Sequence, residues 1–206
     1  MNAGLRRRSC IVKQLRRFRA SEVAGDFHFE QPLNTISPEA TVTEQTQPSN
    51  LPSNVHRGLA RICGQWQGVA RTWFEPGQLA DESSQRGVIR SVLGGYFVVH
   101  EYEGTLQGQP MRGIAIFGFD VATGKCQTAW IDNVHMGTAI MYSEAEPSER
   151  AFVALGSYDD PNGGPPWGWR TEIDLIDDDH ITITAFNIPP GGEAYKAVET
   201  QYRRVS

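Results

Sequence analysis

Charged side chains that alternate with apolar ones are the first candidates for chemistry in this sequence. Asp132 has the same strand parity as Trp130, and Arg90 has the same parity as its apolar neighbours two positions away. A charge on the inward face of a strand is costly unless it is paired or used. We therefore expect Arg90 to form a buried ion pair with Asp132 or with Glu101. A buried carboxylate can anchor a polar ligand or act as a general acid or base, and a purely structural ion pair is the alternative.

Other catalytic and metal-binding patterns are missing from the sequence. The histidines lack metal-ligand spacing such as His-x-His, and no known signature places a nucleophile beside a base. The Asp177-Asp178-Asp179 triplet is expected to form a solvated turn, because a calcium loop needs further oxygen ligands at set spacing. Widely spaced cysteines predict reduced, mostly buried thiols. We therefore expect neither a metal nor a cofactor. The residues considered are His28, His56, His100, His135, His180, Cys10, Cys63 and Cys126.

The elements that must position the candidate residues are short strands. From Gly64 onward, apolar residues recur with period two between turn residues. A short helix precedes them, with Val55, Leu59 and Ile62 on one face. Strands are predicted at about 65–75, 84–93, 95–106, 111–120, 125–133, 136–144, 151–158, 168–176, 180–187 and 194–204.

Short connections between these strands predict their topology. Turn residues such as Gly94-Gly95 and Pro189-Pro190-Gly191-Gly192 favour hairpins between consecutive strands. A long antiparallel meander removes its unpaired edges by closing on itself. The expected fold is therefore all-β, an antiparallel up-and-down β-barrel of about ten strands with a short N-terminal helix. A barrel of roughly eight or more strands has room inside for side chains and one small ligand.

Charge divides the chain into three predicted parts. The net charge is −5, but residues 1–20 hold seven Lys and Arg and no acid, so the rest of the chain carries −12. Residues 1–20 are expected to be a basic amphipathic leader or tail. Residues 21–54, rich in Pro, Ser and Thr, are expected to be a disordered linker. Residues 55–206 are expected to form the barrel domain.

The same charge distribution limits the partners and the location. An acidic domain without a basic cluster argues against nucleic acid as a partner, and no apolar run is long enough for a transmembrane segment. The apolar stretch after Arg7-Arg8 is interrupted too early for an export signal, so a cytoplasmic location is expected. Organellar targeting by residues 1–20 and a misassigned start codon are the alternatives. A homodimer is compatible with the sequence.

A series of motifs in the folded part resembles a known family. Gly64-Gln65-Trp66-Gln67-Gly68 is similar to the G-x-W-x-G opening of lipocalin and calycin barrels. The motifs that follow are Arg90-Ser91-Val92-Leu93-Gly94-Gly95-Tyr96-Phe97, Glu101-Tyr102-Glu103-Gly104, Gly118-Phe119-Asp120, Trp130-Ile131-Asp132, Tyr158-Asp159-Asp160-Pro161 and Tyr202-Arg203-Arg204. In order and spacing, over about residues 56–204, they resemble DUF1579, a bacterial family of unknown function. The resemblance implies a calycin-like β-barrel and no established activity.

The resemblance also implies roles for single residues. In lipocalin-like barrels an Arg of the last strand covers the Trp of the opening motif through a cation–π contact. The residues expected to make this structural closure are Gly64, Trp66, Gly68 and Arg204. The family pattern repeats an acidic residue in Glu-Tyr-x-Gly. The resemblance therefore favours Glu101, and not its neighbour His100, as the residue that faces the lumen.

Three classes of function remain. The leading hypothesis is a barrel that binds a small apolar or amphipathic molecule in a cavity on the order of several hundred Å³. A metal-independent enzyme using lumen carboxylates is the alternative. Haem binding is a variant that ranks lower, because related barrels place an axial histidine near the C-terminus and residues 194–206 contain none. The third class is an inert interaction module addressed to a surface by its tail. The candidate ligand-binding residues are Arg90, Glu101, Tyr102, Trp130 and Asp132.

Overall fold

The computed structural model describes residues 54–161 and 163–205, so the predictions for residues 1–20 and for the linker up to Ser53 lie outside the described residues. No helix in the described part has the length and apolar character needed to cross a bilayer. The elements in chain order are α2 (Asn54–Arg61), β1 (Gly64–Glu75), β2 (Gln78–Val92), the 3-10 turn η1 (Leu93–Gly95), β3 (Phe97–Leu106), β4 (Gln109–Asp120), β5 (Lys125–Asp132), β6 (Met141–Ala145), β7 (Phe152–Tyr158), β8 (Trp167–Leu175), β9 (His180–Ile188) and β10 (Tyr195–Arg204).

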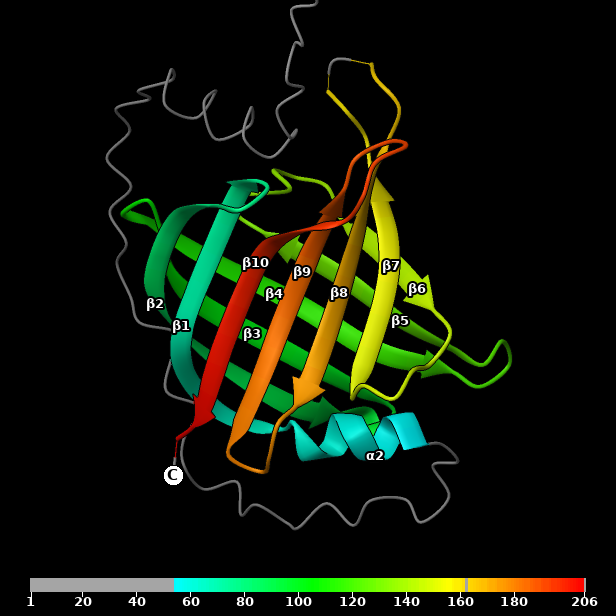
Figure 1. Cartoon of the computed structure of the whole chain (residues 1–206). Coiled ribbons are helices and arrows are strands. Elements are labelled where there is room, and N and C mark those ends of the chain that lie inside the picture. The colour runs from blue at the N-terminus through cyan, green and yellow to red at the C-terminus, as the bar shows by residue number, and fades with distance from the viewer. Residues whose placement is uncertain (1–53, 162, 206) are drawn as a thin grey trace, which may run out of the picture.

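The strands form a single closed barrel (Figure 1). Each strand pairs antiparallel with its neighbours in sequence, and the barrel closes where β1 pairs with β10, from Trp66↔Arg204 to Thr72↔Val198. The all-β, up-and-down barrel predicted from the sequence is confirmed. Because the sheet closes, every described strand has two hydrogen-bonded neighbours and no strand edge is left open.

Alternation along each strand separates the lumen from the outer surface. On β4, Met111, Ala115 and Phe117 are buried, whereas Ile114 and Ile116 between them are exposed. Because successive side chains of a strand point to opposite faces, a shift of one residue would exchange the two sets. Strand parity therefore decides which side chains can reach the interior.

Helix α2 covers one end of the barrel (Figure 1). Leu59 and Ile62 belong to a core cluster that fills this end together with Trp66. The ring of His56 meets the edge of Phe119 with 5.8 Å between centroids. A second core cluster, which includes Trp167, lies toward the other end of the strands. The interior is thus packed at both ends.

The start of β6 differs from the prediction, because this strand begins at Met141 and not near residue 136. The carboxylate of Asp132 accepts hydrogen bonds from the backbone N–H groups that follow it and bends the chain away from β5. Residues 133–140 consequently form a loop. Strand β2 differs in the other direction, starting at Gln78 because Gly77, with φ of 71°, allows a tight hairpin with β1.

Candidate functional site

The lumen of the barrel contains a cavity of about 90 Å³ that is lined by residues of both core clusters. Its walls combine aromatic and sulfur-containing side chains, among them Trp130, Trp169, Tyr102 and Met141, with several serine and threonine side chains. The indoles of Trp130 and Trp169 stack with 5.4 Å between centroids and 11° between planes. The Trp130 indole N–H donates to the hydroxyl oxygen of Tyr102 at 2.8 Å. These contacts give the cavity a flat and rigid apolar wall.

A buried pair, Asp132 and His135, provides polar atoms at the cavity. The Asp132 side chain is fully buried, and that of His135 is 5% exposed. Oδ1 of Asp132 accepts backbone hydrogen bonds from Val134, His135 and Met136 at 3.1, 2.6 and 3.2 Å. Oδ2 of Asp132 is hydrogen-bonded to Nδ1 of His135. The carboxylate therefore fixes both the loop and the imidazole.

The surroundings of Asp132 keep its carboxyl ionised. Burial alone raises the pKa of this group, but the hydrogen bonds from His135 and from the backbone N–H groups outweigh burial, so the pKa of Asp132 lies below its ordinary value. A carboxylate can only accept hydrogen bonds, so Nδ1 of His135 carries the proton between them. Nε2 is then the ring nitrogen that remains for a further hydrogen bond.

Two buried polar atoms beside the cavity have no hydrogen-bond partner among the described residues. They are Nε2 of His135 and Oγ1 of Thr128, and both residues line the cavity. An unpaired buried polar atom costs about 1–3 kcal/mol. A polar group placed against these atoms would complete their bonding.

A second polar chain at the cavity is internally satisfied. Gln85 Nε2 donates to Tyr202 Oη at 2.6 Å, and the Tyr202 hydroxyl lies 3.3 Å from Nε2 of His100. Burial lowers the pKa of His100 to about 3, and burial also raises the pKa of Tyr202. Both groups are therefore neutral near pH 7. Gly87 provides the space, since a Cβ there would lie 2.7 Å from Nε2 of His100.

The family model described as "Protein of unknown function (DUF1579)" matches residues 51–204. The chain belongs to the DUF1579 family. This confirms the resemblance carried by the motifs from Gly64 to Arg204. A search of the curated proteins finds no match to this DUF1579 chain.

Two solved structures are similar to this DUF1579 chain at low sequence identity. The crystal structure of Rv2717c from M. tuberculosis has a TM-score of 0.51 and 12% identity, covering 75% of this chain and 99% of that chain. The S-type phycobiliprotein lyase CPES from Guillardia theta has a TM-score of 0.47 and 10% identity, covering 75% and 94%. The similarity to Rv2717c concerns the fold alone.

Arg90 and Glu101 lie on the outer face of the barrel, so their predicted lumen orientation is wrong. Their side chains are 50% and 48% exposed, and Arg90 Nε lies 3.2 Å from Glu101 Oε2. The predicted pairing exists, but on the solvent side. Ile89 on β2 and His100 on β3 are the buried neighbours, so parity turns Arg90 and Glu101 outward. His100, not Glu101, faces the lumen.

The apolar outer face explains why these two orientations were mistaken. Val88, Ile114 and Ile131 are exposed on neighbouring strands and line an open groove together with Glu101. When both faces of a strand carry apolar residues, composition cannot tell the inside from the outside. The pairing register can, because it aligns buried residues across the whole barrel.

Tyr102, Trp130 and Asp132 lie inside the barrel. The shared inward face of Trp130 and Asp132 was expected from the sequence, whereas Tyr102 has the parity of His100 and not that of the preferred Glu101. Tyr102 and Trp130 line the cavity directly, and Asp132 acts on it through His135. Sequence reasoning missed two residues of the site. Thr128 shares the parity of Trp130 and could have been included on that ground. His135 lies in a loop, where parity carries no information, and its only sequence signal is the Asp-x-x-His spacing.

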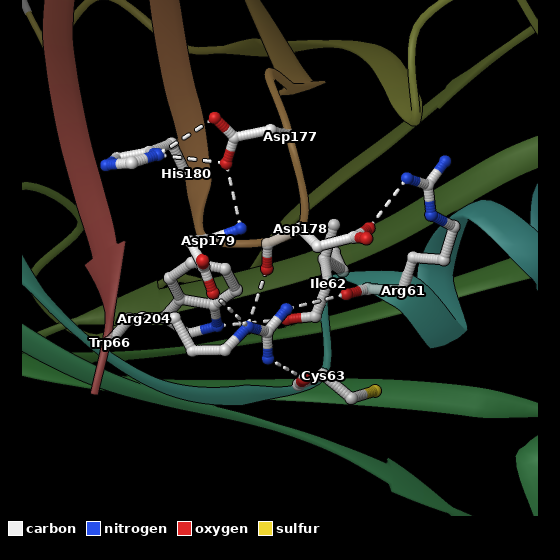
Figure 2. Close-up of polar contacts among 9 residues, drawn as sticks. All are labelled: Arg61, Ile62, Cys63, Trp66, Asp177, Asp178, Asp179, His180 and Arg204. Atoms are coloured by element: carbon white, nitrogen blue, oxygen red, sulfur yellow. Dashed lines mark hydrogen bonds and ion pairs between the residues drawn. The ribbon is translucent and has the colours of Figure 1, made fainter. Parts of the chain in front are cut away.

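Trp66 and Arg204, two of the residues predicted to close the barrel, meet beside the end of α2 (Figure 2). Arg204 lies over the ring of Trp66, whose indole N–H donates to the carbonyl of Ile62 at 2.9 Å. A Cβ at Gly64 would approach Nη1 of Arg204 to 2.2 Å, and one at Gly68 would approach a backbone carbonyl of β10 to 1.9 Å. The two glycines therefore let the chain pass close to the closing residues.

The Asp177-Asp178-Asp179 triplet forms the turn between β8 and β9, beside Arg204 (Figure 2). Its backbone is structural, since the carbonyl of Asp178 accepts a hydrogen bond from Nε of Arg204 at 2.7 Å. Among residues 54–161 and 163–205, no three His, Cys, Asp or Glu side chains gather in a way that could hold a metal ion.

Proposed function

We propose that this DUF1579 chain binds one small, largely apolar molecule in the lumen of its barrel. One observation carries the proposal: the cavity lies in the lumen against stacked aromatic side chains, yet buried polar atoms of His135 and Thr128, two residues that line it, lack partners among the described residues. Aromatic walls favour an apolar body, since burial of apolar surface drives such binding. The unpaired atoms favour one polar group on that body.

The size of the cavity sets the size of the proposed ligand. The sequence predicted several hundred Å³, and the cavity measures about 90 Å³. An engineered protein cavity of about 150 Å³ binds benzene. Met111 and Met141 line the lumen, and methionine side chains adapt to irregular space through their rotatable bonds. These observations support a ligand of about one ring.

Native mass spectrometry of the full chain, purified without denaturation, tests this proposal. A retained molecule should appear as a mass increment that is lost on denaturation and can then be identified. Ala115→Leu, which fills the lumen from β4, should abolish retention. Ala129→Leu on β5 is the matched control, because Ala129 has the outward parity of Ile131.

The melting temperature of both variants should be measured, because overpacking the lumen with Ala115→Leu costs about 1–3 kcal/mol of stability. Retention that is equal in folded Ala115→Leu and Ala129→Leu would show that the molecule sits outside the lumen. A purified chain that retains nothing, and binds no single-ring compound from a fragment set, would end the proposal.

Proton transfer on the bound molecule is a second candidate function. It is favoured by one observation, that Asp132 orients His135 and leaves Nε2 free beside the cavity. An imidazole oriented by a carboxylate is a common general base. Once the retained molecule is known, Asp132→Asn should slow its conversion without preventing its binding. Unchanged conversion would leave binding as the function.

The haem-binding alternative is not supported by this geometry. A haem is much larger than the cavity of about 90 Å³. His180, the last histidine of the chain, is half exposed and paired with Asp177. Titration of the full chain with haem should therefore produce no Soret band shift.

A further inference from the structure

We propose that the molecule held in the lumen is a weak acid of the phenol class, whose O–H group donates a hydrogen bond to Nε2 of His135. This inference rests on the proposed function, because it requires that the lumen holds a ligand. It adds the chemical class of that ligand and the atom that recognises it.

The geometry points to Nε2 of His135 as the recognising atom. Asp132 holds Nδ1, on one side of the ring, so Nε2 on the other side faces away from the carboxylate. His135 borders two spaces, the lumen cavity of about 90 Å³ and a smaller one of about 10 Å³. The smaller space can hold at most about one water. A ligand that pairs with Nε2 therefore occupies the lumen cavity.

The hydrogen-bonding capacity of Nε2 favours a ligand oxygen that can donate as well as accept. Because Asp132 keeps a proton on Nδ1, His135 and the ligand share one further proton between Nε2 and the ligand oxygen. A phenol satisfies both positions of this proton. With the proton on the ligand, the phenol O–H donates to Nε2. With the proton on Nε2, the imidazolium lies between the phenolate and the Asp132 carboxylate and donates to both. An ether or ketone would satisfy only a protonated Nε2. A hydrocarbon would leave Nε2 unpaired in either state.

The aromatic wall fits the ring of such a ligand. The ring centroids of Trp130 and His135 are 5.9 Å apart. A single ring packed on the Trp130–Trp169 wall would thus hold its substituent near the imidazole. Thr128 Oγ1, the other unpaired atom, offers a second hydrogen bond to the same oxygen, because a hydroxyl both donates and accepts.

Three single-ring probes test the inference by calorimetric titration into the full chain: phenol and toluene, which have nearly equal shape, and anisole, which is one methyl group larger than phenol. Phenol donates a hydrogen bond, anisole only accepts one, and toluene does neither. In wild type, phenol should bind most tightly. His135→Asn can still donate an amide N–H to Asp132 but has no atom at the Nε2 position. The preference for phenol over toluene should fall about tenfold in His135→Asn, the value of one buried hydrogen bond.

His180→Asn is the matched control, since it makes the same substitution at a half-exposed histidine that does not line the cavity. It should retain the wild-type preference for phenol. A direct measurement on wild type protects against misfolding of His135→Asn: the ¹⁵N resonance of His135 Nε2 should shift with phenol and not with toluene.

The outcomes separate this inference from the proposed function. If phenol and toluene bind equally, or the Nε2 resonance responds to neither, the weak-acid class is wrong and lumen binding stands. If anisole binds as tightly as phenol, Nε2 is a donor and the inference is overturned. If none of the probes binds, the inference also fails, and the mass measurement of retained molecules decides the proposed function separately.

Discussion

The guanidinium carbon of Arg204 lies 4.2 Å from the centroid of the Trp66 ring. The same guanidinium donates hydrogen bonds to the carbonyls of Cys63, Arg61 and Asp178 at 2.6, 3.0 and 2.7 Å. One side chain of β10 therefore joins the α2–β1 connection, the first strand and the β8–β9 turn. Because Trp66 and Arg204 are also register partners, this contact lies where the barrel closes.

Loss of the Arg204 contacts should destabilise the barrel. Arg204→Ala removes the cation–π contact and leaves three carbonyls without their donor, so we expect the free energy of unfolding to fall by about 2–3 kcal/mol. Urea denaturation measures this change. Arg203→Ala, at an exposed neighbouring position, is the control and should stay within about 0.5 kcal/mol of wild type. Equal effects of the two substitutions would contradict a closing role for Arg204.

Substitution of Asp132 by asparagine should switch the tautomer of His135. Oδ1 of residue 132 must keep accepting from three backbone N–H groups, so the new amide N–H₂ is forced to face Nδ1. Nδ1 then becomes an acceptor and the proton moves to Nε2. The ¹⁵N spectrum of the imidazole should show this exchange. The exposed His180 should keep its spectrum, and an unchanged His135 would show that Asp132 does not set the tautomer.

The stability of the barrel should decrease on acidification because His100 is buried as a neutral ring. Its pKa is 6.5 in the unfolded chain and about 3 in the folded one. Between these values the unfolded chain binds more protons, so its population grows as pH falls. The free energy of unfolding should drop by up to about 1.4 kcal/mol per pH unit in this window. Asp132, with its lowered pKa, adds a further loss only at more acidic pH.

Urea denaturation between pH 7 and pH 4 measures the His100 effect. His100→Gln keeps an acceptor for Tyr202 and cannot be charged, so it should flatten the pH dependence. His180→Gln changes a half-exposed residue and should retain the wild-type slope. A slope that survives in His100→Gln would assign the effect to another group.

The space for the Tyr102 ring depends on Gly113. A Cβ at residue 113 would lie 2.2 Å from the Tyr102 hydroxyl, and that ring is held by Trp130 and cannot move freely. Gly113→Ala should therefore cost about 1–3 kcal/mol. Gly118→Ala on the same strand is the control, since its Cβ would meet only the exposed Phe97 ring. Comparable melting temperatures for both variants would contradict this account.

The Arg90–Glu101 pair should contribute nothing to the lumen site. Both side chains are about half exposed on the outer face, and exposed ion pairs contribute about 0–1 kcal/mol. Glu101→Gln should leave retention of the lumen molecule and the preference for phenol unchanged. Tyr102→Phe changes the adjacent inward residue and should alter binding, since it removes the acceptor for Trp130. Loss of binding in Glu101→Gln would contradict this prediction and show that Glu101 contributes to ligand binding.

The sequence by itself determined the barrel, because its information is local and periodic. Alternation of apolar residues and the spacing of turns predict ten consecutive antiparallel strands, and all ten are present. The same alternation placed Trp130 and Asp132 on one inward face. The G-x-W-x-G motif and the last-strand arginine predicted the contact between Trp66 and Arg204. Each of these inferences needs only spacing along one or two strands.

Only the tertiary structure decided which residues form the site. Arg90 and Glu101 lie on strands with apolar residues on both faces, so their orientation depends on the register with neighbouring strands. His135 lies in a loop whose path is set by hydrogen bonds to one carboxylate. The size of the lumen depends on how Trp130, Trp169 and the methionines pack across the barrel. Long-range packing and loop conformation produce no regular spacing of residue types along the chain, so they cannot be predicted from a single sequence.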